Sequence, residues 1–239
     1  MAIRGILFDK DGTLIDYQRT WVPINREVAL YAAGGDTALA AELLLRFGQD
    51  PATDEVVPGS VLAAGSIDDI AGAFAGYLGP RTPPGLGAGI ERIYSAGGAM
   101  HAVLIDGVRE ALSELKRRGF RLGVATNDSD GGLEASLSRP NILGVFDFTA
   151  GCDSGFGSKP GPGMALAFCK AVGIAPAEAA MVGDAVHDLA MGRAGGFALA
   201  VGVLSGTSAR EELEDYADLI LDSVSDMLVR PEFRAVPRS

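Results

Sequence analysis

Two aspartates near the start of the chain stand where a short apolar run ends. Asp9 and Asp11 flank Lys10 in the segment DKDGTL, and Gly12 follows them. Carboxylates at i and i+2 on irregular backbone can face one small pocket, and glycine lets the chain turn sharply there. One carboxylate can attack phosphorus while the other serves as a general acid and then as a base. Because two close carboxylates repel each other, a divalent cation is needed to hold both beside one phosphate.

Residues with complementary chemistry follow later in the chain. Thr126 and Asn127 end a second apolar run, and a hydroxyl and an amide can donate to a phosphate oxygen without adding charge. Lys159, in the segment GSKPGP, carries an ammonium that can neutralise both a nucleophile and a phosphate. Asp184 and Asp188 lie four apart at an expected helix start, so both project from one face.

Each of these features also has a plain structural explanation. Asp and Gly are common in turns, and Thr and Asn often cap helices. A lysine is usually a solvated surface group, and acidic residues suit a helix N-terminus. Their placement favours the functional interpretation, because they follow predicted strands or begin predicted helices.

The elements that would position these residues alternate between strands and helices. Five apolar runs are predicted strands: Ile3–Phe8, Phe120–Ala125, Ala179–Val182, Phe197–Val203 and Ala217–Leu221. Helical spacing covers Val108–Arg118, Gly163–Val172, Val186–Ala194 and Thr207–Tyr216. This alternation predicts an α/β fold, a Rossmann-like parallel sheet with helices on both faces. Ligands bind beyond the carboxyl ends of such strands, where Asp9, Thr126 and Asp184 stand.

The stretch between the first and second predicted strands breaks this alternation. It contains helical segments and a loop rich in Gly and Pro: Trp21–Ala32, Thr37–Phe47, Ser66–Tyr77 and the loop Pro80–Gly89. We predict a helical cap domain at residues 17–102, inserted after the first strand. Residues 1–16 and 103–239 would form the α/β core domain.

The segment DKDGTL resembles the first motif of the haloacid dehalogenase superfamily of phosphatases. Three further motifs occur in the expected order: TN at 126–127, the lysine at 159, and GDAVHD at 183–188, which is similar to G-D-x-x-x-D. The family commonly shows K-P-D-P where this chain has KPGP. Gly161 therefore stands in place of an acid in the lysine's loop, while the lysine itself is kept.

The resemblance implies a mechanism. Asp9 would attack phosphorus in line and form an aspartyl phosphate, while Asp11 would protonate the leaving alkoxide. Asp11 would then deprotonate the water that hydrolyses the intermediate. Thr126, Asn127 and Lys159 would bind the phosphoryl oxygens and offset their charge.

The resemblance also implies a Mg²⁺ site. Asp184 would complete the oxygen shell of the metal together with Asp9 and the backbone carbonyl of Asp11. Asp188 would lie behind these ligands and hold a metal-bound water or Lys159.

The whole pattern looks most like the phosphoglycolate phosphatase branch, which implies 2-phosphoglycolate or another small organic phosphate as substrate. Dehalogenases of the superfamily lack the second aspartate, and its ion-pumping ATPases carry a threonine there. A phosphomutase on the same core is the enzymatic alternative. It would need an acid/base pair in the cap, and residues 17–100 contain neither His nor Lys. A non-catalytic sensor of a phosphorylated metabolite is the alternative from another class, although binding alone requires no nucleophile.

Substrate-facing residues of the cap are harder to assign. Four candidates for facing the cleft are Trp21, Arg19, Arg46 and Ser60. Core packing is the better explanation for the tryptophan, and solvation for the two arginines. His187 is expected on a helix surface, and His101 in polar packing between the two domains.

Composition limits the partners of the chain. The excess of 31 acidic over 20 basic residues gives a net charge of −11, which argues against nucleic acid and anionic membranes as partners. A small phosphorylated metabolite must then be drawn in by a local positive site. Cys152 and Cys169 make no disulfide framework, and no signal peptide or apolar stretch of about 18 residues occurs. We expect a cytoplasmic protein, as a monomer or homodimer.

Overall fold

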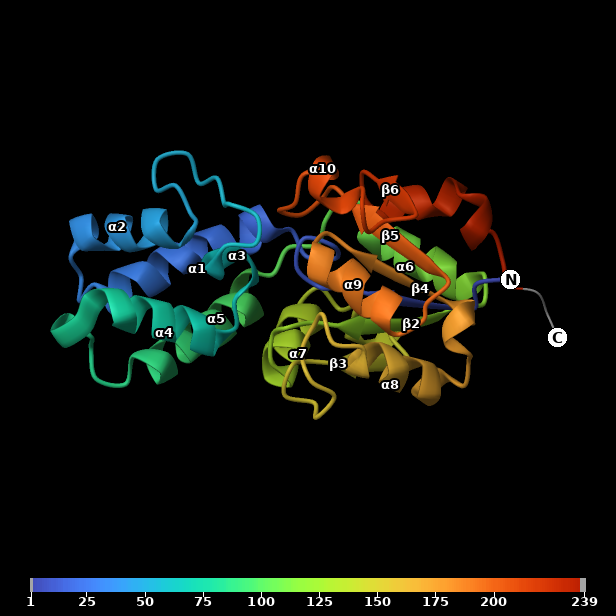
Figure 1. Cartoon of the computed structure of the whole chain (residues 1–239), viewed down its shortest axis with the longest axis horizontal. Coiled ribbons are helices and arrows are strands. Elements are labelled where there is room, and N and C mark those ends of the chain that lie inside the picture. The colour runs from blue at the N-terminus through green and yellow to red at the C-terminus, as the bar shows by residue number, and fades with distance from the viewer. Residues whose placement is uncertain (1, 237–239) are drawn as a thin grey trace.

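The computed structural model describes residues 2–236, and a sheet of six parallel strands runs through its larger part (Figure 1). The strands lie in the order β3-β2-β1-β4-β5-β6, and every neighbouring pair is parallel. Their bounds are β1 (Gly5–Phe8), β2 (Arg121–Ala125), β3 (Phe148–Ala150), β4 (Ala179–Gly183), β5 (Leu199–Val203) and β6 (Leu219–Leu221). The predicted α/β fold class is confirmed.

Helices cover both faces of this sheet. They are α6 (Val108–Arg117), α7 (Asp130–Ser138), α8 (Gly163–Val172), α9 (Val186–Ala194) and α10 (Arg210–Leu213). Successive residues of β1 point to opposite faces, as the pleat of a strand requires. Phe8 belongs to the hydrophobic cluster that contains α6, whereas Leu7 packs in the cluster that contains Phe168 of α8. All four residues of β1 are buried, which explains their uninterrupted apolar run.

A second group of helices stands beyond the sheet, at the left of Figure 1. These are α1 (Tyr17–Ala32), α2 (Thr37–Phe47), α3 (Val61–Ala64), α4 (Ile67–Leu78) and α5 (Leu86–His101). Their apolar side chains form a cluster of their own, which includes Val28, Leu43, Phe74 and Ile90. We call residues 17–101 the helical lobe. The division into two domains, with limits at 16/17 and 102/103, stays a prediction. Residues 1 and 237–239 of the predicted core domain lie outside the described part of the chain.

Local sequence explains where the helices of the lobe begin. Asp36 accepts hydrogen bonds from the first backbone N–H groups of α2, and Asp16 accepts one from Arg19 at the start of α1. Ser66 and Asp69 form a reciprocal capping box at the start of α4. These caps satisfy N–H groups that have no partner inside the helix.

The chain enters and leaves the helical lobe along two segments that lie side by side. Ile15 and Leu104 form an antiparallel bridge. The Asp16 N–H donates to the Val103 carbonyl at 2.8 Å, and the Ile105 N–H donates to the Leu14 carbonyl at 3.0 Å. The chain therefore passes between the sheet and the lobe along one paired connection, and α5 of the lobe also packs against α7.

Some elements differ from the sequence-based expectation. Strand β3 was not predicted, because it has three residues of which only Ala150 is buried. The expected helix at Thr207–Tyr216 is limited to the four residues of α10. Helix α5 was missed because its glycines disfavour helix formation. A Cβ atom on Gly89 would lie 2.2 Å from the Tyr31 ring, so close packing explains its glycines.

Within the described residues, five short 3₁₀ helices complete the fold: η1 (Gly79–Arg81), η2 (Leu143–Val145), η3 (Pro176–Glu178), η4 (Val224–Val229) and η5 (Pro231–Phe233). Over residues 2–236, every helix is too short or too polar to cross a membrane.

Candidate active site

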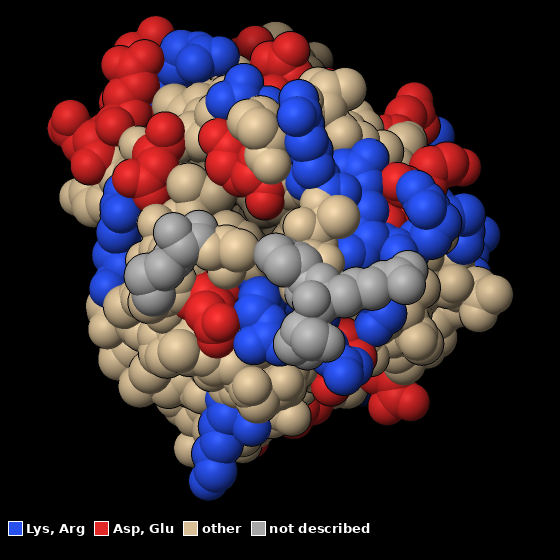
Figure 2. Space-filling model, turned by 90° about the vertical axis from the view of Figure 1, so that its right-hand side faces the viewer, with Lys and Arg blue, Asp and Glu red and all other residues tan. Residues whose placement is uncertain are grey.

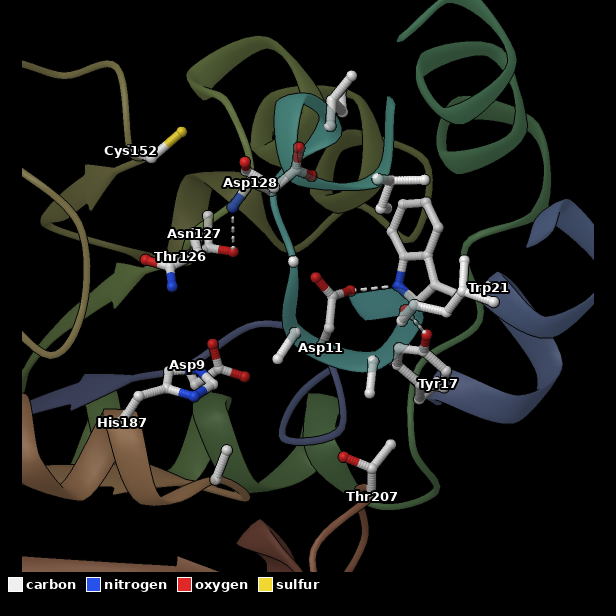
Figure 3. Close-up of a pocket in the computed structure, with 18 of the residues that line it drawn as sticks. Asp9, Asp11, Tyr17, Trp21, Thr126, Asn127, Asp128, Cys152, His187 and Thr207 are labelled. Atoms are coloured by element: carbon white, nitrogen blue, oxygen red, sulfur yellow. Dashed lines mark hydrogen bonds between the residues drawn. The ribbon is translucent and has the colours of Figure 1, made fainter. Parts of the chain in front are cut away.

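Three neighbouring strands end in polar residues at one edge of the sheet. Asp9 follows β1, Thr126 follows β2 and Asp184 follows β4, and these strands are adjacent in the order β2-β1-β4. The Asp9 N–H extends the ladder by donating to the Val182 carbonyl at 2.8 Å. Asp9, Thr126 and Asn127 therefore face the same cleft, which Figure 3 shows.

Lys159 reaches this edge from the loop before α8. Its ammonium contacts Asp9 and lies 2.7 Å from Asp188, and the lysine side chain is fully buried. The Lys159 backbone N–H donates to the Asn127 side-chain oxygen at 2.9 Å, which fixes the loop to the end of β2. With Gly161 in the loop, the lysine still reaches the carboxylates.

Three buried carboxylates gather around this lysine. One oxygen from each of Asp9, Asp184 and Asp188 can be chosen so that all lie within 4.8 Å of one another. Lys159 supplies one positive charge against three potential negative ones, so the cluster lacks positive charge. Buried like charges this close need a cation between them. Carboxylate oxygens are hard ligands, so the donor set fits Mg²⁺.

The pKa shifts of the three carboxylates reflect the same lack of positive charge. Burial, together with the repulsion of Asp188, raises the pKa of Asp9 to about 7 despite the attraction of Lys159. Burial and the repulsion of Asp9 also raise the pKa of Asp184 well above its ordinary value. Burial opposes ionisation of Asp188 as well, yet the attraction of Lys159 holds its pKa below the usual value.

Asp184 is held in a tight backbone cradle. Its carboxylate accepts a hydrogen bond from the Thr207 N–H at 3.0 Å and one from the Thr13 hydroxyl at 3.4 Å. A Cβ atom on Gly12 would lie 2.5 Å from this carboxylate, and one on Gly206 would lie 1.9 Å from it. Gly12 also has a φ of +83°, so its place in the DKDGTL segment has both a steric and a conformational reason.

The carboxylate of Asp11 is turned toward the helical lobe. It accepts a hydrogen bond from the indole N–H of Trp21 on α1, as Figure 3 shows, and lies 2.8 Å from the Lys10 ammonium. A quarter of the Asp11 side chain stays exposed, and the residue lines the cleft. The side chain of Asp11 thus stands apart from the three-carboxylate cluster and can be reached by a substrate.

Sequence reasoning missed Lys10 and Asp128. The Lys10 side chain is fully buried, 2.9 Å from Asp128 and 4.7 Å from the centre of the Trp21 ring system. Burial opposes its charge, but Asp11 and Asp128 hold its pKa above the ordinary value. A lysine between two aspartates at a buried strand end was the available signal, since such a charge needs a partner.

The candidates from the lobe have separate outcomes. Trp21 lines the cleft although it is 7% exposed, so it serves both the cleft and the core. The other three do not line the cleft: Arg19 pairs with Asp16, the Arg46 guanidinium lies over Tyr77, and Ser60 caps α3.

The two histidines also differ. His187 lines the cleft, with Nε2 at 3.4 Å from a carboxylate oxygen of Asp188, and burial lowers its pKa. It is therefore closer to the site than its expected position on a helix surface implied. His101 is exposed at the end of α5.

The cleft between the strand ends and the helical lobe has a volume of about 400 Å³. Cavities of about 300–1,000 Å³ commonly hold small-molecule ligands. Its floor carries Asp9, Thr126 and Asp184, and its opposite wall carries Trp21 and Tyr94 of the lobe. A phosphomonoester placed there would meet the carboxylates at one end and the lobe at the other.

Comparison with known proteins gives this site a family. The model of haloacid dehalogenase-like hydrolases matches residues 3–196. "Probable phosphatase IndB" of Dickeya dadantii is 34% identical over 93% of this chain and 91% of that protein. N-acetylmuramic acid 6-phosphate phosphatase of Pseudomonas putida is 27% identical over 82% of this chain and 81% of that protein. Phosphoglycolate phosphatase 1 of Pseudomonas aeruginosa is 27% identical over 94% of this chain and 78% of that protein.

Solved structures share the fold. The crystal structure of a HAD family hydrolase from Deinococcus radiodurans R1 superposes with a TM-score of 0.69. The two chains are 19% identical, and the match covers 98% of this chain and 99% of the other.

Proposed function

The chain belongs to the haloacid dehalogenase-like hydrolases, and from that premise we propose a Mg²⁺-dependent phosphatase that works through a phosphoaspartyl intermediate on Asp9. Its phosphatase relatives identify it as a phosphoric monoester hydrolase. The finer proposal rests on one observation: the buried Lys159 ammonium contacts both Asp9 and Asp188 beside Asp184, on the floor of a cleft. A binding module would not need this cluster, because phosphate binding favours positive charge over carboxylates.

In the first half-reaction, a carboxylate oxygen of Asp9 attacks phosphorus and the bond from phosphorus to the leaving oxygen breaks. Asp11 gives its proton to that oxygen, so the product leaves as a neutral alcohol. Lys159 offsets charge on the phosphoryl oxygens, and the Thr126 hydroxyl and the Asn127 amide donate to them. Asn127 is free to do so through its NH₂ group, because its oxygen already accepts from the Lys159 backbone.

In the second half-reaction, Asp11 takes a proton from water and the water oxygen attacks phosphorus. The acyl phosphate bond then breaks, which releases inorganic phosphate and restores the Asp9 carboxylate. The same residue can serve as acid and then base because its carboxylate stays open to the cleft.

Asp9, Asp184 and the backbone carbonyl of Asp11 would hold Mg²⁺, and Asp188 would support this set from behind while it fixes Lys159. When bound, the ion supplies positive charge next to the phosphoryl oxygens and relieves the repulsion between the carboxylates. We assign residues 17–102 the role of a cap that excludes water during the attack.

For the substrate, 2-phosphoglycolate is the candidate from the sequence resemblance. The names of the relatives range from phosphoglycolate phosphatase to N-acetylmuramic acid 6-phosphate phosphatase, so the named leaving groups differ greatly in size, although both carry a carboxylate. The chemistry of the cleft wall bears on this choice.

The proposal is tested by trapping the intermediate. The protein is mixed with Mg²⁺ and a phosphomonoester, quenched with acid, digested and examined by mass spectrometry. Phosphate is expected on the peptide that contains Asp9, and it should be absent without Mg²⁺ and in Asp9→Asn. Turnover with no phosphate on Asp9, or with phosphate on another residue, would contradict the mechanism.

A further inference from the structure

The wall of the cleft that faces the leaving group differs in charge from the floor. The floor is underlain by the buried ammonium groups of Lys10 and Lys159. The wall from the helical lobe carries Asp68 and Glu91, and Glu212 of α10 joins them at the rim. All three of these carboxylates are exposed.

Three arginines of the lobe are directed elsewhere, and Arg81 and Arg92 do not line the cleft. Arg26 lies 2.6 Å from Asp54, Arg46 stacks on Tyr77 and Arg19 faces Asp16, and the described residues that line the cleft include no Lys or Arg. Lys and Arg side chains are instead numerous on the end of the molecule away from the lobe, interspersed with acidic ones (Figure 2). A carboxylate on the leaving group would therefore meet acidic side chains without a cation to pair with.

Hydrogen bonding within the wall points the same way. The Tyr94 hydroxyl donates to the Asn25 side-chain oxygen at 2.6 Å, and the Tyr17 hydroxyl donates to the Leu62 carbonyl. The Asn25 NH₂ group donates to Gln49 at 3.0 Å. These donors are used inside the lobe. The Tyr17 oxygen also accepts from the Asn25 NH₂ group at 3.4 Å, so the wall offers the Tyr94 oxygen and the carboxylates of Asp68 and Glu91 as acceptors.

Ser66, which also lines the cleft, donates its hydroxyl proton to Asp69 at 2.7 Å. Apart from the Ser95 hydroxyl, which can also donate, these groups of the wall are acceptors, so a matching ligand brings donors. An ionised carboxylate brings none, whereas a hydroxyl or an ammonium does.

We propose, on the basis of the phosphatase function above, that the natural leaving group is an uncharged or amino-bearing alcohol and not a hydroxy acid. The cleft of about 400 Å³ has room for a substituent larger than two carbons. The substrate class is thus a phosphorylated polyol or amino alcohol, with its phosphate on the floor and its hydroxyl or amino groups against the wall. Under this proposal 2-phosphoglycolate is a poor substrate.

Three phosphomonoesters of equal length test the proposal directly. 2-Phosphoglycolate, 2-hydroxyethyl phosphate and O-phosphoethanolamine all have a two-carbon leaving group, and these groups end in a carboxylate, a hydroxyl and an ammonium, respectively. With Mg²⁺ at fixed ionic strength, we expect kcat/KM of the hydroxyl and ammonium compounds to exceed that of 2-phosphoglycolate by about tenfold or more, since an unpaired carboxylate is costly to desolvate. Glucose 6-phosphate and glucosamine 6-phosphate extend the comparison to larger leaving groups.

The outcomes separate this proposal from the proposed function. If 2-phosphoglycolate is the best of the three, the leaving-group proposal is wrong while the phosphatase function stands. If neither these compounds nor p-nitrophenyl phosphate is hydrolysed, the phosphatase function itself fails.

A charge variant tests the role of the wall. Asp68→Asn combined with Glu91→Gln should raise kcat/KM for 2-phosphoglycolate relative to O-phosphoethanolamine by about two- to tenfold, and added salt should reduce the change, because exposed charges are screened. Glu27→Gln removes an exposed carboxylate of α1 that does not line the cleft, and it should leave this ratio unchanged. An unchanged ratio in the double variant would overturn the assigned role of these carboxylates.

Discussion

The floor of the cleft and its opposite wall are both polar, but they are built in opposite ways. On the floor, ionisable groups are buried or partly buried and contact one another: Lys159 with Asp9 and Asp188, and Lys10 with Asp11 and Asp128. On the wall, neutral hydroxyl and amide groups satisfy one another, and the carboxylates stand in solvent.

This difference separates two tasks. Buried charges interact strongly and are fixed in place, which suits a reaction in which charge moves. A wall of neutral groups with exposed charges at its rim can only sort ligands by shape, hydrogen bonding and weak electrostatics. Trp21 is the exception, because it belongs to the wall and donates to Asp11 on the floor.

The largest effect is expected on the floor. Asp9→Asn removes the nucleophile and should lower kcat by roughly 10⁴- to 10⁶-fold. Because the replacement also removes a buried carboxylate whose pKa is raised, the metal-free variant should be at least as stable to heat as the parent. Phosphate release and thermal unfolding in EDTA measure the two results. If Asp9→Asn kept activity near the parent level, the floor of the cleft would not be the site of the reaction.

The next effect concerns Lys10, the second buried lysine of the floor. Lys10→Met leaves Asp11 and Asp128 without their common partner, so kcat for alkyl phosphates should fall on the order of 10²-fold through misplacement of Asp11. Loss of one partner of a buried pair should also destabilise the fold by about 3–5 kcal/mol.

Adding Asp128→Asn to Lys10→Met should restore part of this stability but not kcat, because the partner of Asp11 is still missing. Urea unfolding of the two single variants and the double variant gives the coupling free energy between Lys10 and Asp128, and steady-state kinetics gives their kcat values. Full additivity of the stability effects would mean that Lys10 and Asp128 do not interact.

Trp21→Phe tests the one link between wall and floor. The ring is kept and the indole N–H is lost, so the effect should be about tenfold on kcat for alkyl phosphates, as for a hydrogen bond to a charged group. p-Nitrophenyl phosphate needs little help from a general acid and should be affected less. Equal losses for both substrates would indicate that Trp21 supports the fold and not Asp11.

The smallest effect is on thermal stability without metal. The folded pKa of Asp9 is about 7, above the ordinary value of 3.8, so between these values the folded state holds a proton that the unfolded state has lost. In EDTA, Tm should therefore fall by a few degrees as pH rises from about 5 to about 8. Mg²⁺ should raise Tm more at the higher pH, because it binds the ionised carboxylate. In Asp9→Asn, the part of this pH dependence that comes from Asp9 should be lost. If Tm of the variant and of the parent changed with pH in the same way, the raised pKa of Asp9 would be contradicted.

The floor of the cleft was largely predictable from the sequence, whereas its wall was not. Most strands were predictable as apolar runs that end in polar residues, whereas β3, with one buried residue, was not. The location of Asp9, Thr126 and Asp184 followed from the rule that parallel strands present their carboxyl ends at one edge. That a buried Lys10 needs an acidic partner could be predicted, but the choice of Asp128 could not, because it is 118 residues away.

The wall was not predictable because its residues come from separate helices at positions that core packing explains equally well. Tyr17 and Trp21 belong to the hydrophobic cluster of the lobe and line the cleft as well. Helix α5, which carries Tyr94, was missed altogether, since its glycines are explained only by the close approach of α1. The roles of Asp9, Asp11 and Trp21 are predictions that the experiments above test directly.

The paired segments around Ile15 and Leu104 have a consequence for engineering. Since the chain leaves and returns at adjacent points, exchanging residues 17–101 for another helical insert would not re-route the backbone of the sheet, but the insert would have to replace the packing of α5 on α7 and the hydrogen bond from Trp21 to Asp11. A new insert joined at these paired segments would change which compounds enter the cleft, while the backbone at the strand ends that carry Asp9, Thr126 and Asp184 would keep its course.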